Sequence, residues 1–296
     1  MKPQKSYLLG IYTKSPLHVG SGSSVDIVDM PITRERITNY PVIPASALKG
    51  VLRQEAVDSL GGKNEQVNVL FGNRDDNYKD EKGKDISYGG AMFFGEAKLL
   101  AFPVRSLKGC FAWVTCPLAL NRLKRDTDSL FEVPKIETDK CIASDFVVSN
   151  GTVVLEEYPL TVDKSLQISN DIISELERLS DDPVWQSELK QRLIITSDEN
   201  FQHFVTTTTE IVARIAINPK TRTNTGLFNQ ENAPSESVYY SVCHILGERK
   251  SGTEGTSSTT FESMFNDGKM YLQLGGNETI GLGLCEVKLS ELNGGN

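Results

Sequence analysis

The first candidate for chemistry is the polar segment LHVGSGSSVDIVDMPITRE, which places His18, Asp26 and Asp29 among glycines and serines near the start of the chain. A carboxylate in such a loop can accept a proton from an attacking hydroxyl or bind a divalent cation. Hydrolysis of RNA needs little more, because the ribose 2′-hydroxyl supplies the nucleophile and a metal or base activates it. The alternative is structural, since a single aspartate in a loop also forms turns and caps.

A second candidate is the closing segment LGGNETIGLGLCEV, in which Gly275, Gly276, Gly281 and Gly283 fall within nine residues. Glycines allow positive φ angles and bring backbone N–H groups close to an anion such as a phosphate. The segment lacks the Lys-Ser/Thr pair of a P-loop, and it does not lead from a strand into a helix as a dinucleotide-binding motif does. The segment can therefore be interpreted either as a tight turn between strands or as an anion-binding site.

Basic side chains form a third group. Lys49 lies near the start of an expected helix, where its charge opposes the helix dipole unless a phosphate binds at the same end. Arg105, Ser106 and Lys108 follow an apolar strand, a position from which side chains can hold a sugar-phosphate backbone. The stretch from 98 to 125 contains six basic residues and no acidic one. We expect this stretch to form a basic patch.

The chain as a whole is acidic, with 31 basic and 39 acidic residues, a net charge of −8 and a pI near 5.1. This balance argues against a protein that coats nucleic acid nonspecifically. An acidic total can still coexist with a basic groove. The acids are concentrated at 171–210, where nine acidic residues accompany three basic ones. We expect this acidic segment to face away from any nucleic acid.

Cysteines, histidines and apolar runs exclude several classes of protein. The five cysteines never occur as C-x-x-C and there are only three histidines, so no zinc-finger ligand set can be assembled. Buried free thiols in a reducing compartment are the expectation. No apolar run approaches the roughly 20 residues of a membrane span, and the N-terminal apolar stretch is too short for a secretory signal. We expect a cytoplasmic protein with no membrane partner.

Periodicity and turn residues predict the order of the elements. Leu48, Leu52 and Ala56 share one helix face, and a helical pattern over 171–194 breaks at Pro183. The expected elements are a first strand at 6–15, a helix at 44–60, an exposed loop at about 61–90, paired strands within 89–106 and 109–117, a helix at 117–126, a helical insertion at about 165–200, a hairpin at about 203–230, a strand at 238–246, a helix at 259–268 and two closing strands.

This order indicates an α+β fold in a single domain that covers residues 1–296. A strand, a helix, paired strands, a second helical region and late strands fit a ferredoxin-like βαββαβ core enlarged by inserted loops. Neither an internal repeat nor a low-complexity linker marks a domain boundary.

Several segments together resemble one known family, the RAMP-type backbone subunits that form the fourth component of type III-B (Cmr) CRISPR effector complexes. The likeness runs from about residue 6 to residue 289. The segments that carry it are PLHVGSG, VDMPITRE, YPVIPASALKGVLR, LAFPVRS, VTCPLALNRL, GLFNQENAPSESVYYS and GGNETIGLGLC.

The resemblance implies a fold and a function. Such subunits have a modified RRM-like palm and a β-hairpin thumb, and they polymerise along a CRISPR RNA with other Cmr subunits. Each copy would hold about six nucleotides, within the usual range for modules that bind single strands. Target RNA paired to the guide would be cleaved once per subunit with a divalent metal, Mg²⁺ or Mn²⁺. The expected partners are crRNA, target RNA, Cmr subunits and copies of the chain in a helical filament.

The resemblance also implies roles for individual residues. The catalytic, metal-binding aspartate precedes the PITRE stretch and falls on Asp29, with Asp26 as second choice. His18 matches a histidine that positions phosphate. Glu231 matches an acidic position facing the cleavage site. The residues expected to bind RNA are Lys49, Arg53, Arg105, Ser106, Gly281 and Gly283.

Two other interpretations remain. A structural subunit would bind guide RNA in the same filament and leave cleavage to other components, and it would need no carboxylate at Asp29. A ribonuclease that acts alone to process guide RNA commonly uses a histidine or tyrosine as general base. His18 instead lies in the PLHVG segment, which matches the backbone subunits.

Overall fold

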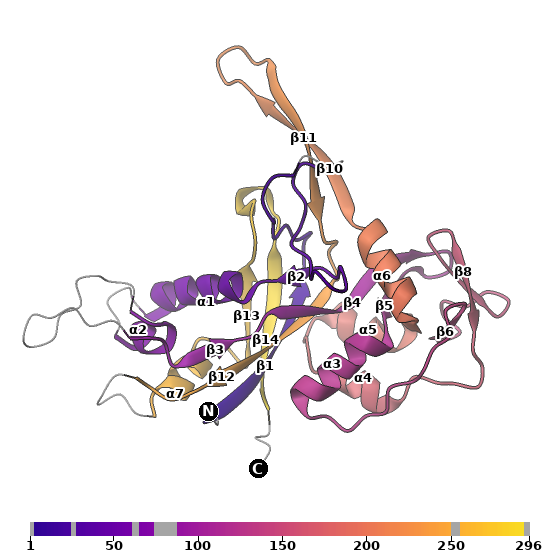
Figure 1. The fold of residues 1–296 in the computed structure, drawn as a ribbon, viewed down its shortest axis with the longest axis horizontal. Coiled ribbons are helices and arrows are strands. Elements are labelled where there is room, and N and C mark those ends of the chain that lie inside the picture. The colour runs from indigo at the N-terminus through magenta and orange to yellow at the C-terminus, as the bar shows by residue number, and fades with distance from the viewer. Residues whose placement is uncertain (1–2, 25–27, 61–64, 74–87, 250–254, 293–296) are drawn as a thin grey trace, which may run out of the picture.

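The computed structural model describes residues 3–24, 28–60, 65–73, 88–249 and 255–292, and it has a mixed α+β architecture built on a sheet (Figure 1). The main sheet of the described residues contains twelve strands. Their order is β13 (Lys269–Gln273), β14 (Leu284–Leu292), β1 (Lys5–Thr13), β12 (Val238–Ile245), β4 (Ala97–Ser106), β5 (Cys110–Thr115), β9 (Leu193–Thr196), β6 (Lys140–Ala143), β8 (Tyr158–Val162) and β7 (Thr152–Leu155), with β2 (Val42–Ile43) on β4 and β3 (Met92–Phe94) on β12.

Strand β1 is the centre of one half of this sheet. It pairs antiparallel with β12 on one side and with β14 on the other. All residues from Tyr7 to Thr13 are buried, because the strand is covered on both faces. Burial on both faces explains why the segment reads as a nearly continuous apolar run and does not alternate.

Strand β4 joins the two halves of the sheet. Its first half pairs with β12, where Leu99 faces Tyr239. Its second half pairs with β5, from Phe102 opposite Val114 to Ser106 opposite Cys110. The hairpin expected within 89–117 is therefore confirmed.

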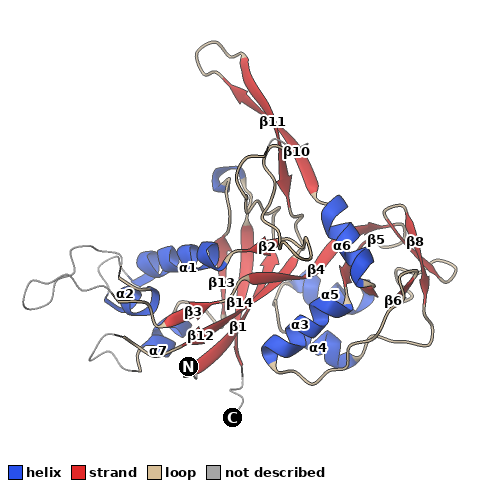
Figure 2. Ribbon diagram, viewed as in Figure 1, coloured by secondary structure: helices blue, strands red, loops and turns tan. Residues whose placement is uncertain are grey.

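The helices lie in two groups (Figures 1 and 2). Helices α1 (Ala45–Leu60), α2 (Glu65–Phe71) and α7 (Ser257–Ser263) lie at the left of the view, and α3 (Pro117–Thr127), α4 (Asn170–Glu177), α5 (Pro183–Arg192) and α6 (Asp198–Thr207) lie at the right. Asp182 caps α5 by accepting from the N–H groups of Val184 and Trp185, which explains the break at Pro183. Within the described residues, no helix has both the length and the apolar character that crossing a membrane requires.

The expected hairpin is present as a separate two-stranded sheet, β10 (Glu210–Ile217) and β11 (Asn224–Asn232), which projects away from the main sheet (Figure 1). It begins at residue 210 and not at 203, because residues 203–207 belong to α6. Ser197 caps that helix and Phe204 anchors it in the core. Helix formation up to Thr207 thus shortens the hairpin.

Two further boundaries differ from expectation. The loop expected at 61–90 contains α2, whose Val67, Leu70 and Phe71 are buried, while 61–64 and 74–87 lie outside the described residues. The helical insertion at 165–200 also contains β9, whose four residues are all buried. Both differences come from short apolar runs that packing, and not periodicity, assigns to a helix or a strand.

Candidate nucleic-acid interface

His18 follows β1 and is held between the hairpin and the glycine-rich turn. Its side chain is only 4 % exposed, and its Nδ1 lies 2.7 Å from the Glu231 carbonyl oxygen on β11. Its own carbonyl accepts the Gly276 N–H at 2.9 Å. His18 therefore joins the opening loop to two segments more than 200 residues away along the chain.

Asp29 lies where the opening loop runs beside the base of the hairpin. Its Oδ2 accepts the Asn229 N–H at 2.7 Å. The next residue, Met30, forms a parallel bridge with Gln230. Asp29 is half-buried, and within the described ranges no ion pair and no other hydrogen bond engages its carboxylate. The remaining oxygen lone pairs are therefore available to a cation or a substrate. Asp26 lies outside the described residues.

Glu231 is bound on every side by protein groups. Its Oε1 accepts from Arg34 Nη2 at 2.5 Å and from the Thr209 hydroxyl at 2.9 Å. Its Oε2 accepts the Ile32 N–H at 3.0 Å, and the residue is 6 % exposed. A buried carboxylate with these partners holds the loop after Asp29 against the hairpin. The geometry therefore favours a positioning role for Glu231 over contact with substrate.

The glycine-rich turn packs directly on His18. Gly275 has φ +76°, and a Cβ there would lie 2.2 Å from the His18 carbonyl oxygen. Gly283 has φ +78°, and its N–H donates to the Pro16 carbonyl. The Gly281 N–H donates to the Glu278 carbonyl. The N–H groups of Gly281 and Gly283 are used internally, so these donors are not presented to an anion. Close backbone packing requires glycine at Gly275 and Gly283.

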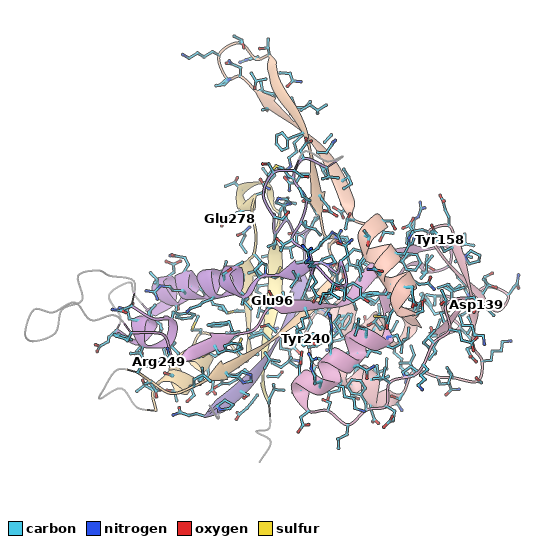
Figure 3. All side chains as sticks on the ribbon, viewed as in Figure 1. Glu96, Asp139, Tyr158, Tyr240, Arg249 and Glu278 are labelled. Atoms are coloured by element: carbon cyan, nitrogen blue, oxygen red, sulfur yellow. The ribbon has the colours of Figure 1, made fainter. Side chains whose placement is uncertain are left out.

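Four segments distant in sequence therefore meet at one place: residues 17–20, residues 29–34, the base of the hairpin and the turn between β13 and β14. Asn277 of the turn donates to Gln230 of β11 at 3.1 Å, which closes the arrangement. Figure 3 shows the turn, marked by Glu278, next to the base of the hairpin.

Lys49 lies in the second turn of α1 beside other cations. Burial, Arg53 and Arg249 together lower the pKa of Lys49 below its ordinary value of 10.5. Within the described ranges no carboxylate forms an ion pair with Lys49. Three neighbouring positive charges make this a favourable place for a phosphate. Figure 3 shows Arg249 on the side of the molecule that carries α2.

Arg53 links α1 to the following segment. Its guanidinium donates to the Gly72 carbonyl at 2.6 Å and to Asn68 Oδ1 at 2.9 Å. These bonds orient the side chain next to Lys49. Arg53 therefore supplies charge at the Lys49 site while its donors bind protein groups.

Arg105 and Ser106 lie at the far end of β4 and differ from each other. Arg105 is exposed and forms an ion pair with Glu156 at 2.8 Å. Ser106 is only 4 % exposed, and its hydroxyl has no hydrogen-bond partner in the part of the chain that the structure describes. The hydroxyl of Ser106 is thus not presented to a strand on the surface.

The expected basic patch over 98–125 is not formed. Four acidic side chains outside that run form ion pairs with five of its six cations, and Lys108 donates to the carbonyls of Asp145 and Val148. The five pairs are Lys98–Asp126, Arg105–Glu156, Arg122–Glu35, Lys124–Glu132 and Arg125–Asp126. A segment that lacks acidic residues in the sequence can therefore lie next to acidic residues of other segments in the fold.

The residues described contain no group of three or more histidine, cysteine, aspartate or glutamate side chains that could hold a metal ion. The Asp29 carboxylate offers oxygen ligands, which Mg²⁺ and Mn²⁺ prefer. The cysteines are free, and Cys110 is exposed whereas the other four are buried as expected.

Sequence reasoning missed several residues of this site. Arg34 binds Glu231 and the Val205 carbonyl, and its position in the sequence does not indicate either contact. No sequence pattern indicates Arg249 or Thr209 as a site residue, because each contributes through a contact that only the fold creates.

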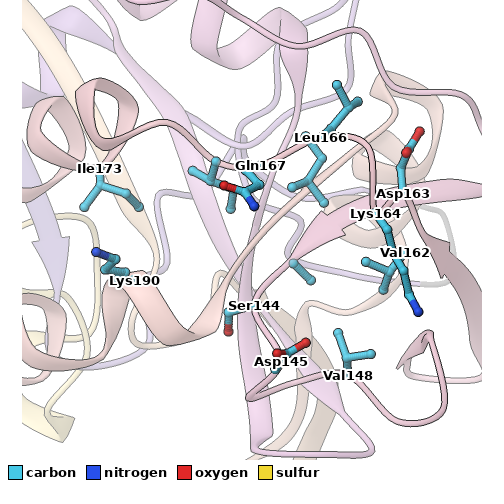
Figure 4. A pocket seen from close by; sticks show the side chains of 13 residues that line it. Ser144, Asp145, Val148, Val162, Asp163, Lys164, Leu166, Gln167, Ile173 and Lys190 are labelled. Carbon is cyan, nitrogen blue, oxygen red and sulfur yellow. The ribbon is translucent and has the colours of Figure 1, made fainter.

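A cavity of about 530 Å³ lies elsewhere, between β6, α5 and the segment after β8 (Figure 4). Its lining includes Asp145, Lys164 and Lys190 but none of the expected site residues. The site described above is thus a surface where loops converge and not this cavity.

The chain is similar to known proteins over nearly its full length. The model of the RAMP superfamily matches residues 11–286. The chain is 38% identical to the protein named "CRISPR system Cmr endoribonuclease Cmr4" of Pyrococcus furiosus, over 98% of each chain. It is 26% identical to "CRISPR system CMR subunit Cmr4" of Saccharolobus solfataricus, over 92% of each.

Solved structures show the same fold. The crystal structure of oligomeric Cmr4 from Pyrococcus furiosus superposes with a TM-score of 0.75 at 32% identity, covering 98% of this chain and 99% of that one. A chain in the cryo-EM structure of the type III-B Cmr-beta bound to cognate target RNA gives 0.73 at 22% identity, covering 98% of each, and shows the fold alone. The chain therefore belongs to the RAMP superfamily and, within it, to the Cmr4 family.

Proposed function

We propose that this chain is the backbone subunit of a type III-B Cmr ribonucleoprotein in the cytoplasm. It binds guide crRNA as a filament of its own copies, together with other Cmr subunits, and it cleaves complementary RNA as a metal-dependent endoribonuclease. The observation that carries the proposal is the Asp29 carboxylate, held by the hairpin base in a chain 38% identical to a relative named an endoribonuclease.

The proposed palm is a ferredoxin-like, RRM-like unit with the β10–β11 hairpin as thumb. Strands β14, β1, β12 and β4 are neighbours in this order and are antiparallel. Helix α1 follows β1, and α7 follows β12. This order supports a βαββαβ core in which the remaining elements are insertions.

Asp29 is the residue proposed to hold Mg²⁺ or Mn²⁺. Its carboxylate suits a hard cation, and the Asn229 N–H orients it. The cation would supply Lewis-acid activation of the attacking hydroxyl and charge stabilisation at the phosphate. One carboxylate binds such a cation weakly, so RNA phosphates must provide further ligands. His18 and Glu231 keep the loop in place, and the isolated chain is expected to show little activity.

The cations around Lys49 are proposed to hold the guide backbone. Lys49, Arg53 and Arg249 lie together, and the acidic segment 171–210 contributes no group that shifts the pKa of Lys49. In Figure 1, α1 lies on the left and α4 and α5, which carry much of that acidity, lie on the right. This separation supports an RNA path along the α1 side of the sheet.

The decisive experiment uses the complex assembled with guide RNA and a labelled complementary RNA in Mg²⁺. Wild type is compared with Asp29→Asn, which keeps the shape of the side chain and removes its charge. Glu96→Gln is the matched control, because Glu96 is an exposed carboxylate away from the loop. We expect wild type and Glu96→Gln to cut at intervals of about six nucleotides, a footprint typical of single-strand binding modules.

Loss of all cuts in Asp29→Asn, with target binding unchanged, would support the endoribonuclease proposal. Unchanged cutting would move the chemistry to Asp26 or to another subunit. Binding without cutting in wild type would favour the second candidate, a structural subunit that only holds the guide.

A further inference from the structure

The Asp29 loop runs along the hairpin as a short third strand. The Met30 N–H donates to the Asn229 carbonyl at 3.1 Å, and the Met30 carbonyl accepts the Glu231 N–H at 3.0 Å. The Asp29 carboxylate accepts the N–H of the same Asn229. The backbone of β11 therefore fixes both the chain at Met30 and the direction of the Asp29 side chain. A displacement of β11 at this point would move the carboxylate.

The hairpin that makes these contacts depends on support from the rest of the molecule. It is a separate two-stranded sheet that projects from the main sheet (Figure 1). A ribbon of two strands is only marginally stable by itself. Side chains of its outer part such as Ile215 and Leu227 are exposed, whereas residues 230–232 at its base are buried. The position of β11 beside Asp29 is therefore set at the base of the hairpin.

Gln230 links the base of the hairpin to the glycine-rich turn. The residue is 1 % exposed. Its Oε1 accepts from Asn277 Nδ2 at 3.1 Å, and its Nε2 donates to Asn232 Oδ1 at 2.7 Å. A buried amide is costly to leave unpaired, so these two bonds favour one orientation of the side chain. Because Gln230 is buried, it acts through the residues around it and not by touching RNA.

Asn277 is attached to the main sheet. It lies in the turn between β13 and β14 with φ +68°, a left-handed conformation that asparagine tolerates better than most residues. The adjacent Gly276 N–H donates to the His18 carbonyl at 2.9 Å, which connects the turn to the segment that follows β1. The bond from Asn277 to Gln230 therefore holds β11 against the main sheet, next to the contacts of Asp29.

We propose that Gln230 is a positioning residue for RNA cleavage. Together with Asn277 it holds β11 in the place from which the Asn229 N–H directs the Asp29 carboxylate towards the cation and the RNA phosphate. Groups that orient a metal ligand in this way contribute to metal affinity and to activity without touching the metal. The inference rests on the proposed function, since it concerns the carboxylate proposed to bind the cation.

The first test compares Asn277→Gly with wild type in the assembled complex. Glycine adopts the left-handed backbone readily, so this variant removes the amide donor without straining the turn. Asn150→Gly is the matched control, because Asn150 is exposed between β6 and β7 and also has a positive φ of +50°. With saturating target RNA and fixed Mg²⁺, we expect Asn277→Gly to cut about tenfold more slowly and to bind RNA as wild type does. Asn150→Gly should cut at the wild-type rate.

The dependence of the cutting rate on Mg²⁺ concentration separates positioning from a loss of folded complex. A misdirected carboxylate binds the cation less well, so Asn277→Gly should need about tenfold more Mg²⁺ for half of its maximal rate. A loss of folded complex would lower the maximal rate and leave this concentration unchanged. Gln230→Leu should show the same shift, and the double variant should add little, because both changes remove the same contact.

Hydrogen–deuterium exchange of the full chain without RNA is independent of activity. The lost hydrogen bond should make local opening of β11 easier, so peptides that contain residues 229–231 should exchange about fivefold faster in Asn277→Gly. Peptides from β1 should exchange as in wild type, and Asn150→Gly should leave residues 229–231 unchanged.

The outcomes separate the inference from the proposed function. Wild-type cutting, Mg²⁺ requirement and exchange in Asn277→Gly would overturn the inference, and loss of cutting in Asp29→Asn would still support the proposed function. Weaker target binding with an unchanged rate at saturation would also overturn the inference, because the Asn277–Gln230 bond would then serve RNA binding. A wild-type complex that binds RNA without cutting would overturn the endoribonuclease proposal and the inference with it.

Discussion

At the scale of single residues, the two carboxylates of the site have different surroundings. Asp29 accepts one backbone N–H, whereas Glu231 accepts three donors, one of them the Arg34 guanidinium. An acid–base or metal-binding group must keep free lone pairs, and a group that orders a loop must use them. Their different hydrogen bonds fit the proposed roles, in which Asp29 binds the cation and Glu231 holds the loop.

Lys49 gives a prediction about pH at the same scale. Burial and the nearby Arg53 and Arg249 lower its pKa in the free protein, and a bound phosphate would raise it again. Binding of RNA then takes up a proton in the interval between the two pKa values, so affinity falls as pH rises through that interval. We expect guide RNA affinity to decrease as pH rises towards the ordinary lysine pKa of 10.5.

Fluorescence anisotropy with labelled guide RNA measures this dependence. Lys49→Arg should flatten it, because a guanidinium stays charged over the whole range. An identical slope in wild type and Lys49→Arg would show that Lys49 does not contact the phosphate.

At the scale of elements, the turn between β13 and β14 is shaped by contact with His18. Gly275 and Gly281 have similar φ angles, +76° and +83°. A Cβ at Gly275 would collide with the His18 carbonyl, whereas nothing lies within 4 Å of a Cβ at Gly281. Both Gly→Ala variants incur about 1 kcal/mol for a left-handed alanine, but only Gly275→Ala must also move the turn.

We therefore expect Gly275→Ala to lower the free energy of unfolding by at least about 2 kcal/mol and Gly281→Ala by about half as much. Urea unfolding of the two variants measures the difference. Equal destabilisation would mean that the turn does not depend on its contact with His18.

At the scale of the whole molecule, an acidic protein is proposed to bind an acidic polymer. The fold pairs the cations of 98–125 with acids outside that run and groups Lys49, Arg53 and Arg249 together. A cation that neutralises a phosphate releases a counterion, and one that is occupied by protein groups does not. Arg249 belongs to the group proposed to bind phosphate, whereas Lys108 is occupied by protein groups.

The dependence of RNA affinity on salt tests this distribution of charge. We expect Arg249→Gln to reduce the slope of log affinity against log salt by about 0.7 for each phosphate that the variant no longer neutralises. Lys108→Gln should leave the slope unchanged, since Lys108 is bound to two backbone carbonyls. A reduced slope in the Lys108 variant alone would place the RNA on the other half of the sheet.

What the sequence determined by itself was local or carried by ordered motifs. The strand at β1, helix α1, the break at Pro183 and the β4–β5 hairpin follow from periodicity and turn residues within a few positions of each other. The resemblance to the Cmr4 family also depended on short ordered segments, and the comparisons confirmed it.

What only the tertiary structure decided depends on contacts between distant segments. Glu231 and its partner Arg34 lie 197 positions apart in the chain, and Asn277 of the turn donates to Gln230 of β11. Hydrogen bonds and ion pairs act over a few ångströms in space, and a sequence pattern does not record which acid will meet which base. The fold therefore assigned the hydrogen-bond partners, and with them the different surroundings of Asp29 and Glu231.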